Sequence, residues 1–229
     1  MDGRDLAMGN VRLSFRRIFS GLGMVGALTA IGVLLAPSSA ALTDGNPGGP
    51  QGCEMTPGDT FEAPVVTPGT FATLSTDATI GPWTVTQNNV DLIGENFWQA
   101  ADGVQSIDLS GSSGSGAALQ GGVSRTFETD GLPLPLFTYV VTYCLAGNPH
   151  AGPAVKTGQV LVNGTPVQDM SFDITGRSVS DMGYRLETFS FTSSGSSAEV
   201  EFRGTTPTAY GPVIDKVTFK KCLLGLFCF

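Results

Sequence analysis

Histidine and charge are scarce in this chain, and each shortage argues against a class of function. His150 is the only histidine, and charged residues make up 14% of the 229 positions. No Cys-x-x-Cys pair occurs, so the ligand spacing of a zinc site is missing. His150 lies in the turn-rich stretch 147–153 with no nucleophile motif beside it, so we expect a solvated turn residue rather than a catalytic base.

Helical periodicity is also missing after the first 40 residues, where apolar and polar residues alternate instead. In residues 198–203, for example, Ala198, Val200 and Phe202 alternate with charged side chains. Such alternation places one face of a strand in a core, and the 31 glycines suit turns. We therefore predict an all-β fold, a two-sheet jelly-roll sandwich. The expected strands are Thr60–Val66, Trp83–Gln87, Val90–Ile93, Val104–Leu109, Val123–Glu128, Phe137–Leu145, Gln159–Val162, Val167–Phe172, Leu186–Thr192, Ala198–Arg203 and Val213–Phe219.

The N-terminal segment resembles a secretory signal peptide. Arg12, Arg16 and Arg17 form a basic region, an apolar run follows at 18–35, and small residues at 37–41 suit cleavage. An uncleaved anchor is the alternative, because about 18 apolar residues lie at the lower limit for crossing a bilayer. The arginine pair also fits a twin-arginine signal, so the export route stays open. The expected divisions are a signal peptide at 1–40, a linker at 41–58, one domain at 59–220 and a cysteine-bearing tail at 221–229.

Acidic residues outnumber basic ones, which bears on the partners to expect. The formal net charge is −8, and loss of residues 1–40 would remove four arginines and two aspartates to leave −10. Such a surface repels phosphate backbones, so nucleic acid is not an expected partner. Neutral polysaccharide or divalent cations suit it better. The apolar tail is too short to cross a membrane, so we expect no stable span after signal cleavage.

Four cysteines in an exported chain predict two disulfides, with three possible connectivities. Cys53 and Cys222 flank the first and last expected strands, which lie near each other in many jelly rolls. We therefore predict the pairs Cys53–Cys222 and Cys144–Cys228, which would fasten the tail to the sandwich.

Five segments of the chain stand out in order: GPWTVTQNNVDLIG (81–94), FWQAADGVQSIDLSG (97–111), YCLAGNPHAGPAVKTGQVLVNG (143–164), FDITGRSVSDMGYRLETFSFT (172–192) and AYGPVIDKVTF (209–219). Together they resemble the choice-of-anchor C family, which is akin to a plant cell-wall group of proteins of unknown function. Both groups look like galactose-binding-type jelly rolls, and the resemblance spans residues ~60 to ~219. Relatives suggest association with cell-wall polysaccharide or wall-modifying enzymes. We expect no C-terminal anchor of the family's usual kind, which favours free secretion.

The resemblance also implies a metal site, because similar jelly rolls often hold a structural Ca²⁺ between their first and last strands. Calcium takes six to eight oxygen ligands, and two acids on neighbouring strands would repel without a cation between them. Solvated carboxylates, or pairing with Lys216 or Arg203, are the alternative. The matching positions are Asp59, Thr60, Glu62 and Asp215.

Aromatic and polar side chains near the expected strand ends suggest a sugar-binding platform. Aromatic rings pack on the C–H faces of sugars, and amide and carboxylate groups bind hydroxyls. Trp98 lies in a polar, turn-rich stretch, where we expect it partly exposed, with a core position as the alternative; Trp83 we expect in the core. The predicted ligand-binding residues are Asp91, Trp98, Gln99, Asp102, Asn148, Tyr184 and Tyr210.

These observations predict a secreted or cell-surface, non-catalytic module that binds cell-wall or extracellular-matrix polysaccharide. A structural or protein-interaction module of the cell envelope, docked on another exported protein, is the alternative. A glycoside hydrolase would need two carboxylates at a fixed separation, one with a raised pKa. No motif selects such a pair, and Asp108 is expected to face solvent because its neighbours Ile107 and Leu109 are apolar.

Overall fold

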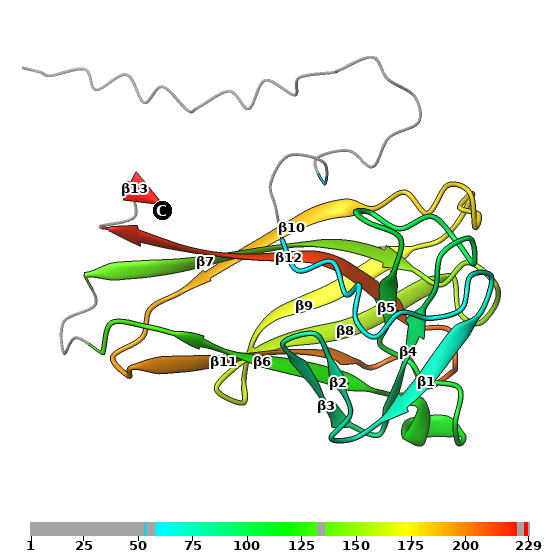
Figure 1. The fold of residues 1–229 in the computed structure, drawn as a ribbon, viewed down its shortest axis with the longest axis horizontal. Helices are drawn as coiled ribbons and strands as arrows, with labels where there is room; N and C mark the ends of the chain where they lie inside the picture. The colour runs from blue at the N-terminus through cyan, green and yellow to red at the C-terminus, as the bar shows by residue number, and fades with distance from the viewer. Residues whose placement is uncertain (1–52, 54–57, 132–135, 224–226, 229) are drawn as a thin grey trace, which may run out of the picture. The chain divides into compact units, whose positions relative to one another are not determined.

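The computed structural model describes residues 53, 58–131, 136–223 and 227–228, which form two antiparallel β-sheets (Figure 1). The first sheet has the order β1-β4-β5-β12-β7-β10, with β13 beside β12, and the second has the order β2-β3-β6-β11-β8-β9. The predicted two-sheet, all-β jelly roll is confirmed. The first sheet contains β1 (Phe71–Ser75), β4 (Asn89–Ile93), β5 (Ser106–Asp108), β7 (Phe137–Gly147), β10 (Arg185–Phe191), β12 (Pro212–Leu223) and β13 (Phe227–Cys228). The second contains β2 (Thr79–Ile80), β3 (Trp83–Gln87), β6 (Gly122–Glu128), β8 (Val155–Val162), β9 (Thr165–Asp173) and β11 (Ser197–Gly204), and a short 3-10 helix, η1 (Gly116–Leu119), precedes β6.

Alternating side chains from both sheets fill the space between them. Trp83 is fully buried, as expected, and its ring contacts those of Phe61, Phe127 and Phe202 at centroid distances of 5.6–6.1 Å. Tyr143 of the first sheet lies 4.8 Å from the Phe202 ring of the second. Burial of such large rings supplies much of the stabilisation of a sandwich core.

A second buried layer covers the outer face of the first sheet. Because Tyr143 points to the second sheet, its neighbour Cys144 and the paired Asp215 face the other way. Asp215 is nevertheless fully buried, as is Ser106, which accepts a hydrogen bond from Trp98. These side chains are therefore covered by the segments that flank β1 and by the loops of the first sheet. Strand alternation alone would place them in solvent.

The expectation that Asp108 is solvated is wrong for this reason. Asp108 is 1% exposed, and its carboxylate accepts hydrogen bonds from the Asn148 side chain and the Gly211 and Ser110 backbone N–H groups. Alternation correctly turns Asp108 away from the inter-sheet core. The alternation pattern carries no information about the loops that cover that face.

The first expected strand, Thr60–Val66, does not form. Asp59 makes an isolated bridge with Val217, and the following residues are held by side chains instead of a ladder. The Gln105 side chain donates to the carbonyl oxygens of Phe61 and Pro64 and accepts from the Val66 N–H. The sandwich instead begins with β1 and β2, which the sequence interpretation missed.

The predicted disulfide pairs are also wrong. The bridges are Cys53–Cys144 and Cys222–Cys228. Cys144 lies on the covered face of β7, where it meets Cys53, while β12 and β13 form a hairpin that pairs Cys222 directly with Cys228. The tail disulfide therefore closes a loop within the tail and joins it neither to Cys53 nor to Cys144, although residues 221–223 pair with β7 as part of β12.

The predicted signal peptide and all of the predicted linker except Cys53 and Gly58 lie outside the described residues. Within the described part, no helix is long and apolar enough to cross a membrane.

Candidate functional site

Four loops meet at one end of the sandwich, which we call the loop end (Figure 1). They are the β4–β5, β7–β8, β9–β10 and β11–β12 connections. The Gln99 N–H donates to the Val179 carbonyl, joining the first and third loops. The Asn148 N–H donates to the Gly211 carbonyl, joining the second and fourth. Backbone bonds between loops hold the end in a defined shape without relying on side chains.

Aromatic rings cluster at the loop end. The Phe97 ring lies 5.5 Å from that of Phe71, 5.4 Å from that of Trp98 and 5.2 Å from that of His150, each in an edge-to-face arrangement. Phe71 is 42% exposed and His150 is also exposed, while Phe97 is partly buried. The cluster thus presents aromatic surface to solvent, supported from below by the buried Trp98.

A hollow of about 310 Å³ lies beside this cluster. Residues 96–99 of the β4–β5 loop form one side, and Val179 and Ser180 of the β9–β10 loop form the other. Gln99 is fixed in it because its Oε1 accepts from the Met182 N–H, at 3.1 Å. The described residues that line the hollow carry amide, hydroxyl and aromatic groups but no ionisable side chain.

The seven predicted ligand-binding residues divide into two groups. Gln99, Asp102 and Tyr210 are partly exposed, and only Gln99 and Trp98 line the hollow. The remaining four are buried and serve as packing or hydrogen-bonding residues in the structure; they are Asp91, Trp98, Asn148 and Tyr184.

The expected exposure of Trp98 is wrong, since only 5% of the residue is accessible. Its indole N–H donates to the Ser106 hydroxyl at 2.8 Å, which supplies the partner that a buried indole needs. Tyr184 is 2% exposed, and its hydroxyl has no hydrogen-bond partner among the described residues. Burial raises the pKa of Tyr184 well above its ordinary value, and the negative charge of Asp215 adds to this effect.

Asn148 and Asp91 belong to a polar network around Asp108. Asp91 and Asp108 are register partners on β4 and β5, and Asp91 accepts from the hydroxyls of Thr73 and Ser112. Burial raises the pKa of Asp108 to about 8, although the hydrogen bond from Asn148 acts in the opposite direction. The network anchors the β7–β8 and β11–β12 loops beneath the loop end.

The four predicted metal-binding residues are brought together only in part. Glu62 and Asp215 both bind the β4–β5 loop through hydrogen bonds. The Glu62 carboxylate accepts from the N–H groups of Val104 and Gln105. The Asp215 carboxylate accepts from the N–H groups of Ala101 and Asp102. Burial raises the pKa of Asp215 well above its ordinary value, and the negative charge of Glu62 raises this pKa further. The Glu62 carboxylate is therefore close enough to repel that of Asp215 electrostatically.

Asp59 and Thr60 do not join that pair. The Asp59 carboxylate forms an ion pair with Arg125 instead, because it turns towards β6, and no side-chain contact places Thr60 beside Glu62 or Asp215 in the described part of the chain. No cluster of three or more histidine, cysteine or acidic residues suited to a metal is found among the described residues.

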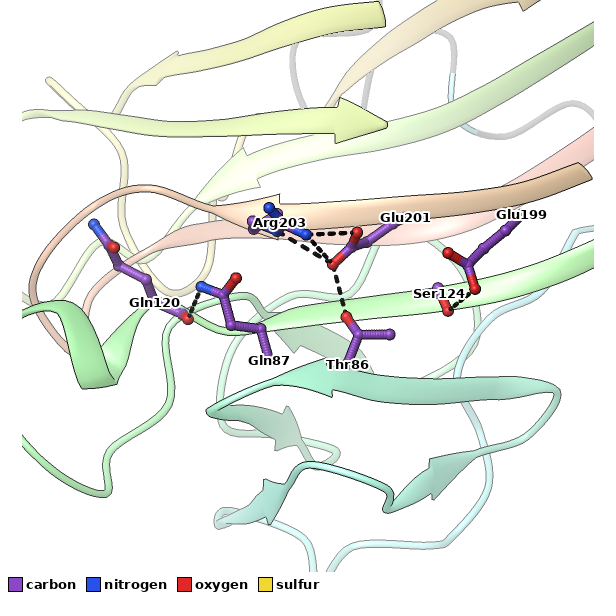
Figure 2. A network of polar contacts seen from close by, with 7 residues as sticks. All are labelled: Thr86, Gln87, Gln120, Ser124, Glu199, Glu201 and Arg203. Carbon is purple, nitrogen blue, oxygen red and sulfur yellow. Dashed lines mark hydrogen bonds and ion pairs between the residues drawn. The ribbon is translucent and has the colours of Figure 1, made fainter. Parts of the chain in front are cut away.

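The outer face of the second sheet carries a polar network, shown in Figure 2. Arg203 forms an ion pair with Glu201, which also accepts a hydrogen bond from the Thr86 hydroxyl at 2.8 Å. Ser124 donates to Glu199 across the neighbouring strands. Period-two alternation in β11 predicts this polar face.

Phe97 and His150 were missed as candidate site residues. The signal for Phe97 was its position directly before Trp98 in a polar, turn-rich stretch. His150 was interpreted as an isolated turn residue, and nothing local in the sequence places its ring beside that of Phe97, which lies 53 positions earlier in the chain.

The solved structures that resemble this one are low-identity β-domains. A family 35 carbohydrate-binding module from Clostridium thermocellum has 12% identity and a TM-score of 0.41, over 65% of this chain and 97% of that chain. The CBM22-1 xylan-binding domain of Paenibacillus barcinonensis Xyn10C has 19% identity and a TM-score of 0.41, over 69% and 97%. Similarity at this level carries no argument about what this chain binds.

Among curated proteins no match is found. The choice-of-anchor C resemblance finds no counterpart in these comparisons and stays a prediction, whereas the resemblance to the plant cell-wall group is supported by a family match. The family described as a protein of unknown function, DUF642, matches residues 55–220, and the chain belongs to this family.

Proposed function

We propose that the protein is an exported, non-catalytic module that binds a neutral cell-wall or extracellular-matrix polysaccharide through the hollow at its loop end. The observation that carries the proposal is the composition of this hollow, in which Phe97 and Trp98 lie beside the side chains of Asn96, Gln99 and Ser180. Aromatic rings suit the apolar faces of sugars, and amides and hydroxyls suit their hydroxyl groups.

Two further features support the proposal. The described lining of the hollow carries no ionisable side chain that could act as a general acid or base, which suits binding without catalysis. Both disulfides suit an oxidising compartment outside the cytoplasm. The exposed Phe71 extends the aromatic surface beyond the hollow, so a chain of several sugar rings could contact it.

A glycan array followed by depletion on the insoluble polysaccharide tests the proposal. Phe97→Ala should weaken retention about tenfold, since a ring of this size contributes on the order of 1.5 kcal/mol or more when buried. Phe227→Ala is the matched control because Phe227 is 69% exposed at the other end of the sandwich. Equal retention of both variants would refute the loop-end site. Capture of one exported protein without any glycan retention would support the alternative, a structural or protein-interaction module.

We also propose a structural Ca²⁺ bound by Glu62 and Asp215. Bound calcium would neutralise the two carboxylates and fasten the β4–β5 loop, which contributes Phe97 and Trp98 to the hollow, to β12. Thermal melting of chelated protein with added Ca²⁺ tests this proposal. Wild-type protein and Asp59→Asn should both gain in melting temperature, since Asp59 contacts Arg125. Glu62→Gln should not. No shift in wild-type protein would refute the site.

A further inference from the structure

The imidazole of His150 lies on the aromatic cluster of the loop end, in the β7–β8 connection (Figure 1). Its ring centre is 5.2 Å from that of Phe97 and 6.0 Å from that of Trp98, and the residue is exposed. Neither ring nitrogen forms a hydrogen bond with another described residue, since the only bond of His150 is made by its backbone N–H. A neutral imidazole carries one donor and one acceptor nitrogen, so both remain available to a ligand.

A buried asparagine anchors the chain two residues before this ring. Asn148 is 6% exposed, and its Nδ2 donates to the Asp108 carboxyl at 2.8 Å. Its Oδ1 accepts from the His150 backbone N–H at 3.0 Å. A backbone N–H can only donate, so the two bonds together allow one orientation of the amide. The chain that leads into His150 is thereby tied to β5.

A buried lysine anchors the chain one residue after the ring. Lys156 of β8 is fully buried, and its Nζ donates to the Ala151 carbonyl oxygen. It forms no ion pair within the described part of the chain, and its Nζ lies 5.9 Å from the centre of the Tyr210 ring. Gly152, with a φ of +82°, lets the loop close over the ammonium, because a Cβ there would lie 3.2 Å from Nζ. An ammonium buried without a carboxylate is costly, and its one hydrogen bond fixes the residue that follows His150.

The two anchors have two possible roles. They could stabilise the β7–β8 loop as a whole, and the effect of removing either would then not depend on the side chain at position 150. Alternatively, they hold the backbone on both sides of His150 so that its ring stays on the aromatic cluster. A side chain that is already in place binds a ligand with less loss of conformational entropy than a mobile one. The second role accounts for an exposed ring that is flanked on both sides by buried polar groups.

We propose that His150 is a glycan contact of the loop end, in which an imidazole nitrogen binds a sugar hydroxyl, and that Asn148 and Lys156 are the residues that position it. The inference rests on the proposed function and deepens it. His150 does not line the hollow, so its contact extends the site to a further sugar unit of a neutral chain.

Nuclear magnetic resonance of the full chain, without an affinity tag and with labelled histidine, tests the positioning. His150 is the only histidine, so a single imidazole signal reports on it. The ring currents of Phe97 and Trp98 should shift this signal away from that of free histidine. Asn148→Ala and Lys156→Met should each return the signal at least halfway to the free value. An unchanged signal in both variants would overturn the positioning roles.

Asn89→Ala is the matched control for this measurement. Asn89 is buried to the same extent as Asn148, at 6% exposure, and its amide holds a different loop through hydrogen bonds to residues 113 and 118. Those residues take no part in the aromatic cluster. Asn89→Ala should therefore leave the His150 signal in place, and a shift as large as that in Asn148→Ala would overturn the assignment of Asn148.

Isothermal titration with cellohexaose, xylohexaose and mannohexaose, three neutral chains, tests the contact. For a chain that wild-type protein binds, His150→Ala should lower the affinity about fivefold, as expected for the loss of one hydrogen bond. Asn148→Ala should lower it by about as much, but should cause no further loss in the His150→Ala background. His150→Ala keeps the test valid if Asn148→Ala fails to fold, because His150 is exposed.

The outcomes separate this inference from the proposed function. Affinity that falls in Phe97→Ala but is unchanged in His150→Ala would overturn the inference and leave the proposed function standing. A loss in Asn148→Ala that persists in full without the His150 ring would assign Asn148 to the loop as a whole and overturn its positioning role. Absence of binding of all three hexasaccharides by wild-type protein would refute the proposed function for these chains and the His150 contact with it.

Discussion

Removing the two disulfides separately should destabilise the protein by clearly different amounts. The Cys53–Cys144 bridge joins residues 91 positions apart, whereas Cys222–Cys228 spans 6. A cross-link stabilises mainly by restricting the unfolded chain, and the restriction grows with the logarithm of the loop length. This relation gives about 4–5 kcal/mol for the long loop and about 2 kcal/mol for the short one. The double variant Cys53→Ala/Cys144→Ala should therefore lose about twice as much stability as Cys222→Ala/Cys228→Ala.

Urea denaturation of the oxidised proteins measures these differences, and titration of free thiols provides an independent check. With the observed pairing, each double variant keeps the other bridge intact and shows no free thiol. With the pairing Cys53–Cys222 and Cys144–Cys228, either double variant would break both bridges and leave two free cysteines. Two titratable thiols, or equal losses of stability in the two variants, would refute the observed connectivity.

Three further predictions concern the buried layer on the first sheet. Because burial raises the pKa of Asp108 to about 8 from about 3.8 in the unfolded chain, the folded protein binds more protons between these values; stability should fall as pH rises from about 4 to about 8. In urea titrations at pH 5 and pH 8 without calcium, this fall should be larger in wild-type protein than in Asp108→Asn, and an equal fall would contradict the assignment. Trp98→Phe should cost about 1–3 kcal/mol in unfolding free energy because the buried Ser106 hydroxyl loses its donor, and the cost should shrink when Ser106→Ala is added in a double-mutant cycle. Gly211→Ala should cost about 1–3 kcal/mol in the same assay, since its Cβ would lie 2.2 Å from the Ser110 Oγ, and a neutral effect would show that the β11–β12 loop moves freely.

Local alternation was enough to predict the sandwich. Residues 198–203 alternate as β11 requires, and Trp83 lies in the core as its position at the start of a strand suggests. The strand β1 shows the same pattern weakly, with Phe71 exposed and Leu74 more buried, and it was overlooked because it is short and lies among turn residues. Period-two patterns report which way a side chain points relative to its own strand.

Period-two patterns do not predict which segments cover the outer face of a strand. Asp108 and Trp98 are buried by segments distant in sequence, so their environments depend on loop conformations that no local pattern specifies. The disulfide pairs failed for a related reason, because Cys53 lies against the outer face of the first sheet, where it meets Cys144. The hollow at the loop end joins residues 96–99 to 179–180 through a backbone bond between Gln99 and Val179, which sequence patterns cannot reveal.

The most direct test of the account is a tryptophan-fluorescence titration with an oligosaccharide of the retained neutral polysaccharide. The chain has two tryptophans, and Trp98 lines the hollow whereas Trp83 is buried between the sheets. The account predicts a saturable change in emission in wild-type protein and in Phe227→Ala, with about tenfold weaker affinity in Phe97→Ala. Saturable binding with unchanged emission and the same affinity in all three proteins would contradict a glycan site at the loop end.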